Sequence, residues 1–485
     1  MMELKRMGPS EIESLPQAFA FIDELLVILA QQQERIVALE AEVKRLQEHQ
    51  TLDSHTRSLP PSTDKGRQKR PSSQSLRQKS GRQPGGQHGH KGATRTQVDR
   101  PDHIIFSPVS VCSGCGHAVS QVPASGVEKR QVFDRPPLKL AVIEHQAEIK
   151  TCPHCAQSTT GEFPSDVSQP VQSGPRVKGL LVYLNQAQLI PSDRTTTLGE
   201  DLFGQPVSQG TLLNTNQRCY ARLAAPEAQI KQDLHQADVV HFDETGLYEK
   251  GRRIWLHSAS TASRTYYFAH DKRGKVAMEA ADILPNFDGT AVHDHWEAYQ
   301  AFDTCDHAFC KSHHVRELNG AIEHDEAAWA KEMKALLLEI NATVASAKAQ
   351  GAASLSPEQL DQCHARYRDI VDRGLTPYRK EPPANAPPTR GRKKQSNTKN
   401  LLDRFDTYQT ETLRFMTDFR VPFDNNQAER DLRMTKVKQK ISGPFRSENG
   451  TQYFCRIRGY LSTLKKQGQN ILDALTQTFI PNQTV

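Results

Sequence analysis

The sequence predicts a multidomain α/β protein, in which a helix, a cysteine-rich module and a helical domain precede one large domain built around a β-sheet. Three observations lead to this prediction. Apolar residues recur at heptad spacing near the N-terminus, four cysteines form two closely spaced pairs, and residues 237–309 alternate between strand-like and helix-like patterns. The 485 residues are enough for several domains with sizeable cores.

Changes in composition along the chain set the expected domain boundaries. In order, we expect a coiled-coil helix at 15–50, a basic disordered linker at 51–100, a zinc-binding module at 101–165, a helical domain at 170–230, a large α/β domain at 236–466 with a helical insertion at about 320–415, and a C-terminal tail at 467–485.

Composition narrows the class of protein. The formal net charge of +6 is modest, but Lys and Arg are concentrated in three stretches, which favours surfaces that contact a polyanion such as nucleic acid. No N-terminal segment has the features of a signal peptide, and no run approaches the ~20 apolar residues of a membrane span, so we expect a cytoplasmic protein. The nine cysteines include two tight pairs, which indicates a reducing compartment and metal binding rather than a disulfide framework.

Heptad spacing near the N-terminus predicts a coiled coil. One seam position holds Ile22, Leu29, Ile36 and Val43, and the other holds Leu25, Leu39 and Leu46. Gln32 is the only polar seam residue, and one such residue can fix the register of the pairing. Mainly β-branched residues at the first position with leucine at the second favour a parallel dimer. The alternative is an amphipathic helix packed on its own domain.

Residues 51–100 carry eleven Lys or Arg against three Asp and are rich in Ser, Gln, Gly and Pro. Such a segment cannot bury enough apolar surface to fold alone, so we expect a basic, flexible linker. Its end, SGRQPGGQHGHKG, has a more specific composition, in which glycines permit close backbone approach to a ligand. The side chains there that can contact phosphates are Arg82, His88, His90 and Lys91. A plain solvated linker is the alternative.

Four cysteines have the spacing of zinc ligands. Cys112 and Cys115 form one Cys-x2-Cys pair, and Cys152 and Cys155 form the other. Four thiolates in two such knuckles match tetrahedral structural zinc. The 36-residue gap between the pairs is longer than in simple zinc fingers, so the intervening hairpin must be larger. The alternative is four buried free thiols.

Residues 176–224 read as helices, and two of them have the spacing of a helix-turn-helix. The segment RTTTLGEDLFG is followed by a turn and then by VSQGTLLNTNQRCYARL, which would be the helix that enters a major groove. Two packed helices in an ordinary helical domain are an equally good interpretation.

The central region predicts a mixed sheet. ADVVHFDET, RIWLHSAS and RTYYFAH read as three antiparallel strands, KVAMEAADILPNF as a crossover helix, GTAVHD as a strand parallel to the first, and HWEAYQAF as a helix. Asp243 at the end of the first strand and Asp294 at the end of the fourth would then be neighbours, despite 50 intervening residues. Two carboxylates that meet in this way repel each other unless a metal ion lies between them.

A third acidic residue, Glu429, lies on a helix predicted to begin near Asn426, from which it can face the two aspartates. A structural explanation is also available, because Asn426-x-x-Glu429 resembles a capping box and Glu429 can pair with Arg433 one turn later. Most single Asp or Glu residues are solvated or cap helices. Two strand-end aspartates with a later helical glutamate can instead hold a pair of divalent metal ions, as in phosphodiester chemistry on nucleic acid.

At this point the chain resembles transposases of the insertion sequence 66 family, over nearly its whole length. The matching segments are PGGQHGHKG, CSGC, CPHC, LNQAQLIPSDRT, HFDETG, VHDHWEAY, CKSHHVREL, FDNNQAERDLR and KQKISGPFRSENG. The resemblance implies a ribonuclease-H-like, DDE-type catalytic domain in which Asp243, Asp294 and Glu429 are the catalytic triad. It also implies helical material between the second and third acids, where 134 residues intervene here.

The same resemblance implies the reaction, the cofactors and the partners. The triad would hold two Mg²⁺ ions, or Mn²⁺, for cleavage at the element's terminal repeats and strand transfer into target DNA. We expect a homodimer or higher oligomer in the bacterial nucleoid, together with accessory proteins encoded by the same element. Residues 381–400, inside the insertion, read as a basic disordered loop.

The chain departs from the common family pattern after Asp294. Where many members have a segment of cysteine, tryptophan, alanine, histidine and two arginines, this chain has Cys310, Lys311, Ser312, His313, His314, Val315 and Arg316. Cys310 with His313 or His314 could bind a metal or contact the scissile phosphate, and Cys305 and His307 are close in sequence. For this segment we favour a structural hydrogen-bonding role over metal ligation.

Basic residues follow Glu429 and predict contacts with DNA phosphates. They are Arg430, Arg433, Lys436, Lys438, Lys440 and Arg446. Two other functions remain open. One is a DNA-binding regulator derived from a transposase that no longer cleaves DNA, and the other is a zinc-dependent hydrolase that uses the segment from Cys305 to His314.

Overall fold

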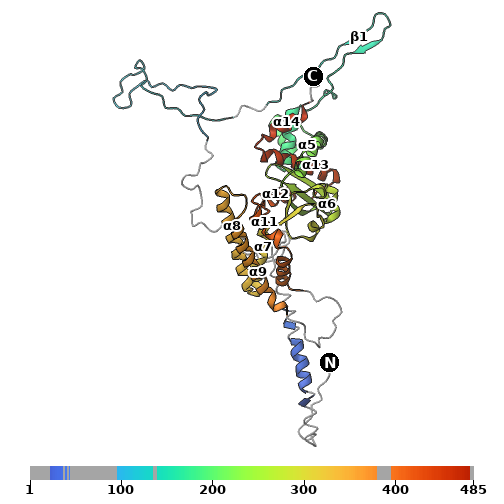
Figure 1. The fold of residues 1–485 in the computed structure, drawn as a ribbon. Helices are drawn as coiled ribbons and strands as arrows, with labels where there is room; N and C mark the ends of the chain where they lie inside the picture. The colour runs from blue at the N-terminus through green and yellow to red at the C-terminus, as the bar shows by residue number, and fades with distance from the viewer. Residues whose placement is uncertain are drawn as a thin grey trace, which may run out of the picture. The chain divides into compact units, whose positions relative to one another are not determined.

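The computed structural model describes residues 22–23, 25–36, 39–40, 43, 95–134, 139–379 and 395–480 (Figure 1). The chain forms two units. The larger contains residues 1–69, 163–200 and 206–485, and the smaller contains residues 70–162 and 201–205. Each unit is described by itself below.

The described residues of the N-terminal heptad segment are helical, as predicted. Ile22, Leu29 and Ile36 are about half exposed to solvent or more, at 48%, 63% and 47%. An exposed apolar seam is what a helix with a missing partner presents, and dimerisation through it stays a prediction. Leu46 and most of the 51–100 linker lie outside the described residues.

The smaller unit is built around two short hairpins. Strands β1 (Ile149–Thr151) and β2 (Ser158–Thr160) pair in antiparallel fashion and enclose the second cysteine pair. An antiparallel bridge between Val111 and Ala118 encloses the first pair. The segment LAVIEHQAEIK between the pairs alternates like a strand, but only its last two residues belong to one.

Helices lead from the second cysteine pair to the sheet. They are α2 (Pro175–Val182), the π-helix η3 (Tyr183–Ala187), α3 (Ser192–Phe203), α4 (Gln209–Arg222) and α5 (Ala224–His235). The predicted helical character of 176–224 is confirmed. Ser208 begins α4, because its hydroxyl accepts a hydrogen bond from the backbone N–H of Thr211 at 3.0 Å.

The sheet has five strands in the order β5-β4-β3-β6-β7. Their bounds are β3 (Val239–Glu249), β4 (Arg252–Ser260), β5 (Thr265–His270), β6 (Thr290–His293) and β7 (Asp306–Phe309). The first three strands pair in antiparallel fashion and β6 is parallel to β3, as predicted. β7, which is parallel to β6, was not predicted.

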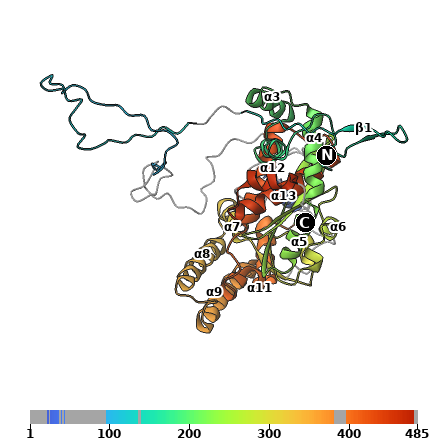
Figure 2. The ribbon, with the colours of Figure 1, turned by 90° about the horizontal axis from the view of Figure 1, so that it is seen from above.

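Apolar residues in the first half of β3 pack on one face of the sheet, and those in its second half pack on the other face. Val240 and Phe242 pack with α5 and α6 (Lys275–Ala281) on one face of the sheet. Leu247 packs with α12 (Asn426–Ser442) and α13 (Glu448–Lys466) on the other face (Figures 1 and 2). Because successive side chains of a strand point to opposite faces, Glu244 shares the α6 face and Asp243 shares the α12 face.

Between β5 and β7 the predicted helices are shorter than expected. KVAMEAADILPNF forms α6 and a separate 3₁₀ turn η4 (Leu284–Asn286), because Asp282 adopts a left-handed conformation with φ 60°. HWEAYQAF forms only the 3₁₀ turn η5 (Glu297–Ala301), so a full helix there was a wrong prediction.

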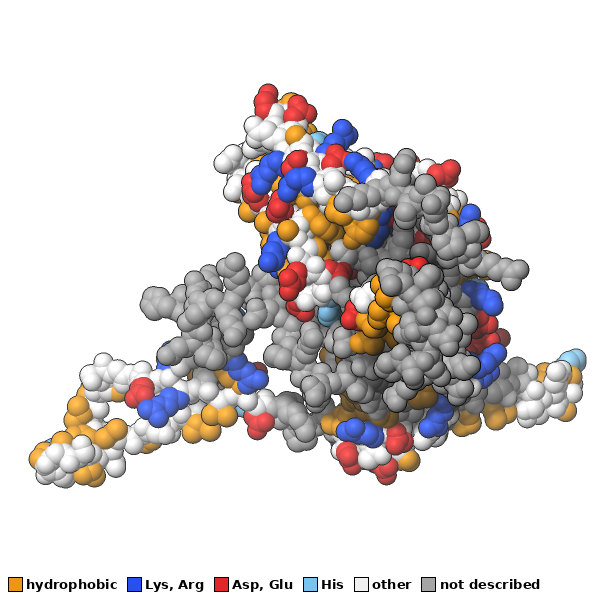
Figure 3. All heavy atoms as spheres, turned by 90° about the horizontal axis from the view of Figure 1, so that it is seen from below, with side chains coloured by type: hydrophobic (Ala, Val, Ile, Leu, Met, Phe, Trp, Pro, Cys, Tyr) orange, Lys and Arg blue, Asp and Glu red, His pale blue; other side chains and the backbone are white. Residues whose placement is uncertain are grey.

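The predicted helical insertion is present and buries an apolar core against β6 and β7. Its helices are α7 (Lys311–Asp325), α8 (Ala328–Ala349), α9 (Pro357–Leu375), the 3₁₀ turn η6 (Thr376–Tyr378), α10 (Asn397–Thr407) and α11 (Gln409–Thr417). α8 and α9 run side by side as a hairpin (Figures 1 and 2). On the face shown in Figure 3, acidic and basic side chains are intermingled on the described surface, in keeping with ion pairs such as Arg366 to Glu339 across this hairpin.

The disordered loop predicted at 381–400 ends too late. Residues 380–394 lie outside the described part of the chain, but α10 already begins at Asn397. The Ser396 hydroxyl caps this helix by accepting a hydrogen bond from the backbone N–H of Lys399 at 3.1 Å. Because this stretch is polar, the start of a helix within it was not recognised from the sequence.

The last helix, α14 (Ile471–Phe479), packs on α2 and α4. Its Leu475 and Phe479 share an apolar core with Val182, Leu223 and Ile457. The segment that we assigned to a C-terminal tail therefore completes the packing of the helical region before the sheet. None of the helices in the described ranges has the length and apolar character needed to cross a membrane.

Gly289, at the start of β6, has no room for a side chain. A Cβ atom there would lie 2.6 Å from the carbonyl oxygen of Ala237 and 2.7 Å from that of Asp238. We expect Gly289→Ala to lower the free energy of unfolding of the larger unit by about 1–3 kcal/mol, because two backbone segments must move apart. Urea unfolding followed by tryptophan fluorescence measures this, since Trp255, Trp296 and Trp329 all lie in this unit.

The matched control is Gly274→Ala, where an added Cβ meets no atom within 4 Å. Its free energy of unfolding should stay within about 0.5 kcal/mol of that of the unaltered protein. Equal unfolding midpoints for the two variants would contradict the packing argument.

Candidate active site and metal centre

Asp243 lies in the middle of β3 and not at the end of the strand, which corrects the sequence prediction. The strand continues because its antiparallel partner β4 stays paired with it up to Glu249 and Arg252. Its parallel partner β6 pairs with it only up to His241. Asp243 is therefore at the place where the parallel partner leaves the sheet.

Asp294 is the first residue after β6. The last register pair of the two parallel strands joins His241 to Val292, and two further steps set Asp243 opposite Asp294. The carboxylate of Asp294 is held by its own chain, since its Oδ1 accepts a hydrogen bond from the backbone N–H of Trp296 at 3.0 Å. The two aspartates are neighbours, as the strand order predicted.

Glu429 lies in the first turn of α12, and its Oε1 accepts a hydrogen bond from Nη2 of Arg316 at 3.0 Å. Neither the capping box nor the pair with Arg433 that was considered for this residue is present. Asn425 and not Asn426 precedes the helix, without a capping hydrogen bond from its side chain. Glu429 pairs with Arg316 on α7 and not with Arg433 on its own helix.

Asn425 connects the elements that carry these residues. It is buried, and its Nδ2 donates to the carbonyl oxygen of Phe242 at 2.7 Å, next to Asp243. Its Oδ1 lies 2.7 Å from Nδ1 of His241, and its backbone N–H donates to Sγ of Cys310 at 3.1 Å. One residue thus fixes β3, the start of α7 and the start of α12 relative to each other.

Glu244 is a fourth carboxylate at the site, on the opposite face of β3. Its side chain is only 2% exposed and is bound by Nε of Arg273 at 3.0 Å and by the hydroxyl of Tyr299 at 2.6 Å. The Arg273 guanidinium also lies 4.8 Å from the ring centre of Trp255 and 4.1 Å from that of Trp296. Stacking of this kind restricts the arginine and with it the carboxylate.

Mutual repulsion and burial dominate the electrostatics of the acids. Burial raises the pKa of Asp243 well above its usual value, and the nearby charges of Glu244, Asp294 and Glu429 raise it further. Burial, and next the charge of Glu244, raise the pKa of Asp294 to about 7. A divalent cation between these carboxylates would remove the repulsion.

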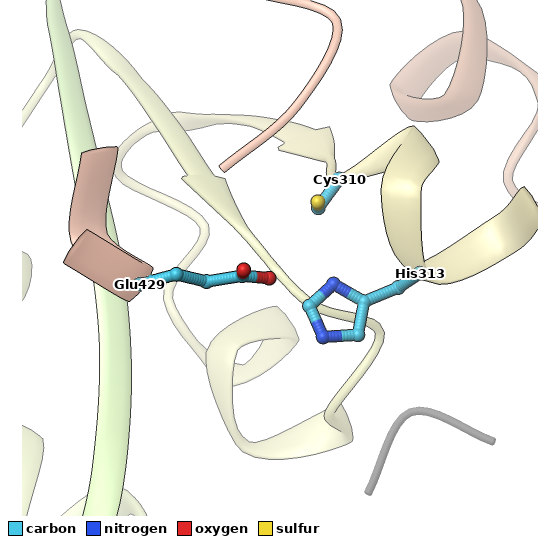
Figure 4. A group of neighbouring side chains, drawn as sticks. All are labelled: Cys310, His313 and Glu429. Atoms are coloured by element: carbon cyan, nitrogen blue, oxygen red, sulfur yellow. The ribbon is translucent and has the colours of Figure 1, made fainter. Parts of the chain in front are cut away.

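Glu429 lies nearer to a different pair of side chains than to the aspartates. Among the described residues, one ligand atom from each of Cys310, His313 and Glu429 lies within 4.8 Å of the others (Figure 4). Asp243 and Asp294 are outside this group, although the charge of Glu429 reaches Asp243. Ligand atoms of Asp243, Asp294 and Glu429 therefore do not all lie within 4.8 Å of one another.

The other members of the segment from Cys305 to His314 do not join this group. The ring of His314 is buried among aromatic side chains. Cys305 Sγ lies 3.9 Å from the carbonyl oxygen of Phe302, and Nδ1 of His307 lies 2.8 Å from Nε2 of His293. The three-ligand hydrolase site predicted as an alternative within this segment is not assembled.

The basic residues after Glu429 fall into two sets. Lys436 donates to the carbonyl oxygen of Gly246 at 2.7 Å, and Lys438 lies 3.6 Å from the ring centre of Phe445. Burial lowers the pKa of Lys438 to about 8. The exposed set consists of Arg430, Arg433, Lys440 and Arg446.

The two cysteine pairs have the same local geometry. In each, the backbone N–H of the second cysteine lowers the pKa of the first cysteine's thiol, which applies to Cys112 and to Cys152. Cys115 and Cys155 are exposed, which contradicts the alternative of four buried free thiols. No three of these four sulfurs lie within 4.8 Å of one another, so the structure shows two halves of a tetrahedral site.

Some predicted DNA contacts cannot be placed. Arg82 and Lys91 lie outside the described residues, as does most of the basic loop in the insertion. α3 and α4 are present as helices, and their use as a helix-turn-helix stays a prediction.

Three residues that build the site were not singled out from the sequence. Glu244 directly follows Asp243, and Asn425 is in the matched segment FDNNQAERDLR, so both were within reach of pattern reasoning. Arg273 lies in the polar turn before α6. Nothing in that turn indicates that its guanidinium reaches across to a strand.

Comparison with known families identifies most of the chain. Residues 170–453 match the family described as "Transposase IS66 family". Residues 110–156 match "zinc-finger binding domain of transposase IS66", which contains both cysteine pairs. Residues 8–96 match a family of unknown function, DUF6444.

Comparison with individual proteins adds little. No curated protein matches the chain. A solved structure, the intasome of simian T-cell lymphotropic virus in complex with PP2A regulatory subunit B56 gamma, has 12% identity and covers 44% of this chain and 80% of its own, with a TM-score of 0.14. A superposition this poor supports no argument.

The transposase match spans more than half of the chain and includes β3, β6 and the start of α12, and the zinc-finger match precedes it in the expected order. The protein therefore belongs to the IS66 family of transposases.

Proposed function

We propose that this protein is a DDE-type transposase with a ribonuclease-H-like core, which cleaves DNA at the ends of its element and joins them to target DNA. Asp243, Asp294 and Glu429 are the proposed catalytic acids. One observation carries the proposal. Asp243 and Asp294 come from adjacent parallel strands and Glu429 comes from α12, and the charges of Asp294 and Glu429 both act on Asp243.

The donor set fits the two Mg²⁺ ions that such a reaction requires. Carboxylate oxygens are the ligands that Mg²⁺ prefers, and burial together with the neighbouring acids raises the pKa values of Asp243 and Asp294, which a bound cation would oppose. When bound, the ions would activate the attacking hydroxyl and stabilise the leaving oxygen at phosphorus.

Other residues of this chain would position the acids. The backbone N–H of Trp296 orients Asp294, and Asn425 holds β3 next to the start of α12. Arg316 would hold the Glu429 carboxylate through the hydrogen bond at 3.0 Å, and its side chain is about a quarter exposed, so it can also reach a phosphate. Glu244 would act as a support because its side chain is already bound by an arginine and a tyrosine.

Helix α12 offers a path for the DNA backbone away from the acids. Arg433 comes four residues after Glu429, and Lys440 comes seven residues after Arg433. This spacing places the three side chains along one face of the helix. Both are exposed, in contrast to Lys436 and Lys438. We assign non-specific phosphate contacts to the exposed set and a structural role to the other two lysines.

The remaining parts would bring the DNA ends to the site. The zinc-finger module and the basic linker would bind the terminal repeats, and α3 and α4 would add further DNA contacts. The N-terminal helices of two subunits would pair the ends. Zinc is the ion that fits two Cys-x2-Cys knuckles. Accessory proteins of the same element are further proposed partners.

The triad is tested by Mg²⁺-dependent cleavage of a DNA that carries the element's own ends. We expect Asp243→Asn, Asp294→Asn and Glu429→Gln each to lower the cleavage rate at least about 100-fold, while binding of the same DNA persists. The charge-matched control is Asp288→Asn, an exposed acid in the loop before β6, which should cleave normally. If the unaltered protein binds these ends without cleaving them, an inactive DNA-binding regulator becomes the better interpretation.

Metal binding should depend on pH. Because the pKa of Asp294 is raised to about 7, a proton occupies this carboxyl below that pH and competes with the cation. We expect the affinity for Mn²⁺ without DNA to be about tenfold lower at pH 6 than at pH 8, with proton release on binding. Calorimetry measures both quantities, and an affinity that is equal at the two pH values would contradict this arrangement.

The cysteine knuckles give a separate prediction. Cys152→Ser should lower the zinc content of the dialysed protein by one equivalent and weaken binding to the element's ends, because one ligand of four is lost. Elemental analysis and a DNA-binding titration measure the two effects. Cys363→Ser, in α9, is the control and should change neither; unchanged zinc content in Cys152→Ser would rule out the shared site.

A further inference from the structure

We propose that Cys310, His313 and Glu429 form a second metal site, which takes a thiophilic divalent cation such as Zn²⁺ or Co²⁺. The site itself does not depend on the proposed function. Its consequence for catalysis does, because Glu429 is also the third proposed catalytic acid.

The geometry already approaches that of a bound ion. One ligand atom from each residue lies within 4.8 Å of the other two, and the three side chains point into the same space from β7–α7 and from α12 (Figure 4). Nδ1 of His313 is buried and has no hydrogen-bond partner among the described residues. A buried polar atom without a partner is unfavourable, and a metal ion would supply the partner.

The turn at Cys310 resembles the two cysteine knuckles of the same chain. Cys310-x2-His313 has the spacing of Cys112-x2-Cys115, and in both the backbone N–H of the last residue favours the thiolate of the first. In Cys310 the backbone N–H of Asn425 adds a second such bond at 3.1 Å.

The donor set suits a soft cation. Coordination of the Cys310 sulfur would release its thiol proton into solvent. Sulfur, nitrogen and one carboxylate oxygen then surround the ion, which disfavours Mg²⁺ and favours Zn²⁺, Co²⁺ or Cd²⁺.

Occupation of this site would withhold Glu429 from the aspartates. Arg316 occupies Oε1 of Glu429, so one carboxylate cannot also serve ions on both sides. A thiophilic ion at Cys310 would therefore act as an inhibitor of Mg²⁺-dependent cleavage. The two ions would compete for the same glutamate, the thiophilic ion together with Cys310 and His313 and Mg²⁺ together with the two aspartates.

The test uses the full-length protein that retains one Zn²⁺ per chain after dialysis, the equivalent held by the knuckles, titrated with Co²⁺ in the absence of DNA. Zinc holds thiolates more tightly than cobalt, so the knuckles keep their metal. We expect a sulfur-to-cobalt charge-transfer absorption band that saturates at one Co²⁺ per chain. Absence of this band in the unaltered protein overturns the proposal without the need for any variant.

Variants assign the band to its ligands. Cys310→Ser should abolish it and His313→Ala should weaken Co²⁺ binding at least about tenfold, within the range for loss of one ligand. Cys363→Ser, which removes a half-buried thiol on α9, should leave the band unchanged. A band that persists in a folded Cys310→Ser variant would also overturn the proposal, and urea unfolding shows whether that variant is folded.

The outcomes separate this site from the proposed function. A cobalt band in a protein that does not cleave DNA keeps the metal site and removes the transposase activity. Cleavage without a cobalt band does the reverse. If both are present, added Zn²⁺ should inhibit cleavage by the unaltered protein, and uninhibited cleavage at saturating Zn²⁺ would reject the competition for Glu429.

Discussion

The side-chain amide of Asn425 is the interaction on which the site depends. The three proposed acids come from segments separated by 50 and by 134 residues, so no local structure can align them. Asn425 spans this separation through hydrogen bonds to Phe242 and His241 on β3 and to the Cys310 sulfur at the start of α7. Both polar atoms of its side-chain amide have a partner on β3, where an unpaired amide group would be costly, and its backbone N–H bonds the sulfur.

The acids are gathered against their own repulsion, and the fold supplies the opposing forces separately on the two faces of β3. On one face Arg273, fixed between two tryptophans, neutralises Glu244. On the other face Arg316 neutralises Glu429. Among the described residues Asp243 and Asp294 form no ion pair, and burial together with the neighbouring carboxylates raises their pKa values. The unbalanced charge is concentrated at the two positions where a cation would be bound.

The sheet and the two aspartates could be predicted because both depend on patterns local to each strand. Alternating apolar residues identified β3 to β6, and the rule for parallel connections then placed Asp294 beside Asp243. The group formed by Cys310, His313 and Glu429 could be predicted only as candidates. Which histidine faces the cysteine depends on the direction of α7, and which arginine pairs with Glu429 depends on how α7 and α12 cross. Neither the direction of α7 nor its crossing with α12 produces a periodic pattern in the sequence. The position of Asp243 inside its strand was not predicted, because β3 stays paired with β4 beyond the point where its pairing with β6 ends.

The packing of α14 on α2 has a consequence for synthesis of the protein. Val182 and Leu223 are made early, but Leu475 and Phe479, which cover them, leave the ribosome among the last described residues. Until then the helical region before the sheet exposes an apolar surface that chaperones and proteases recognise. A product that ends early lacks this cover even when it contains every proposed catalytic acid. Completion of this core therefore depends on synthesis of the chain as far as α14.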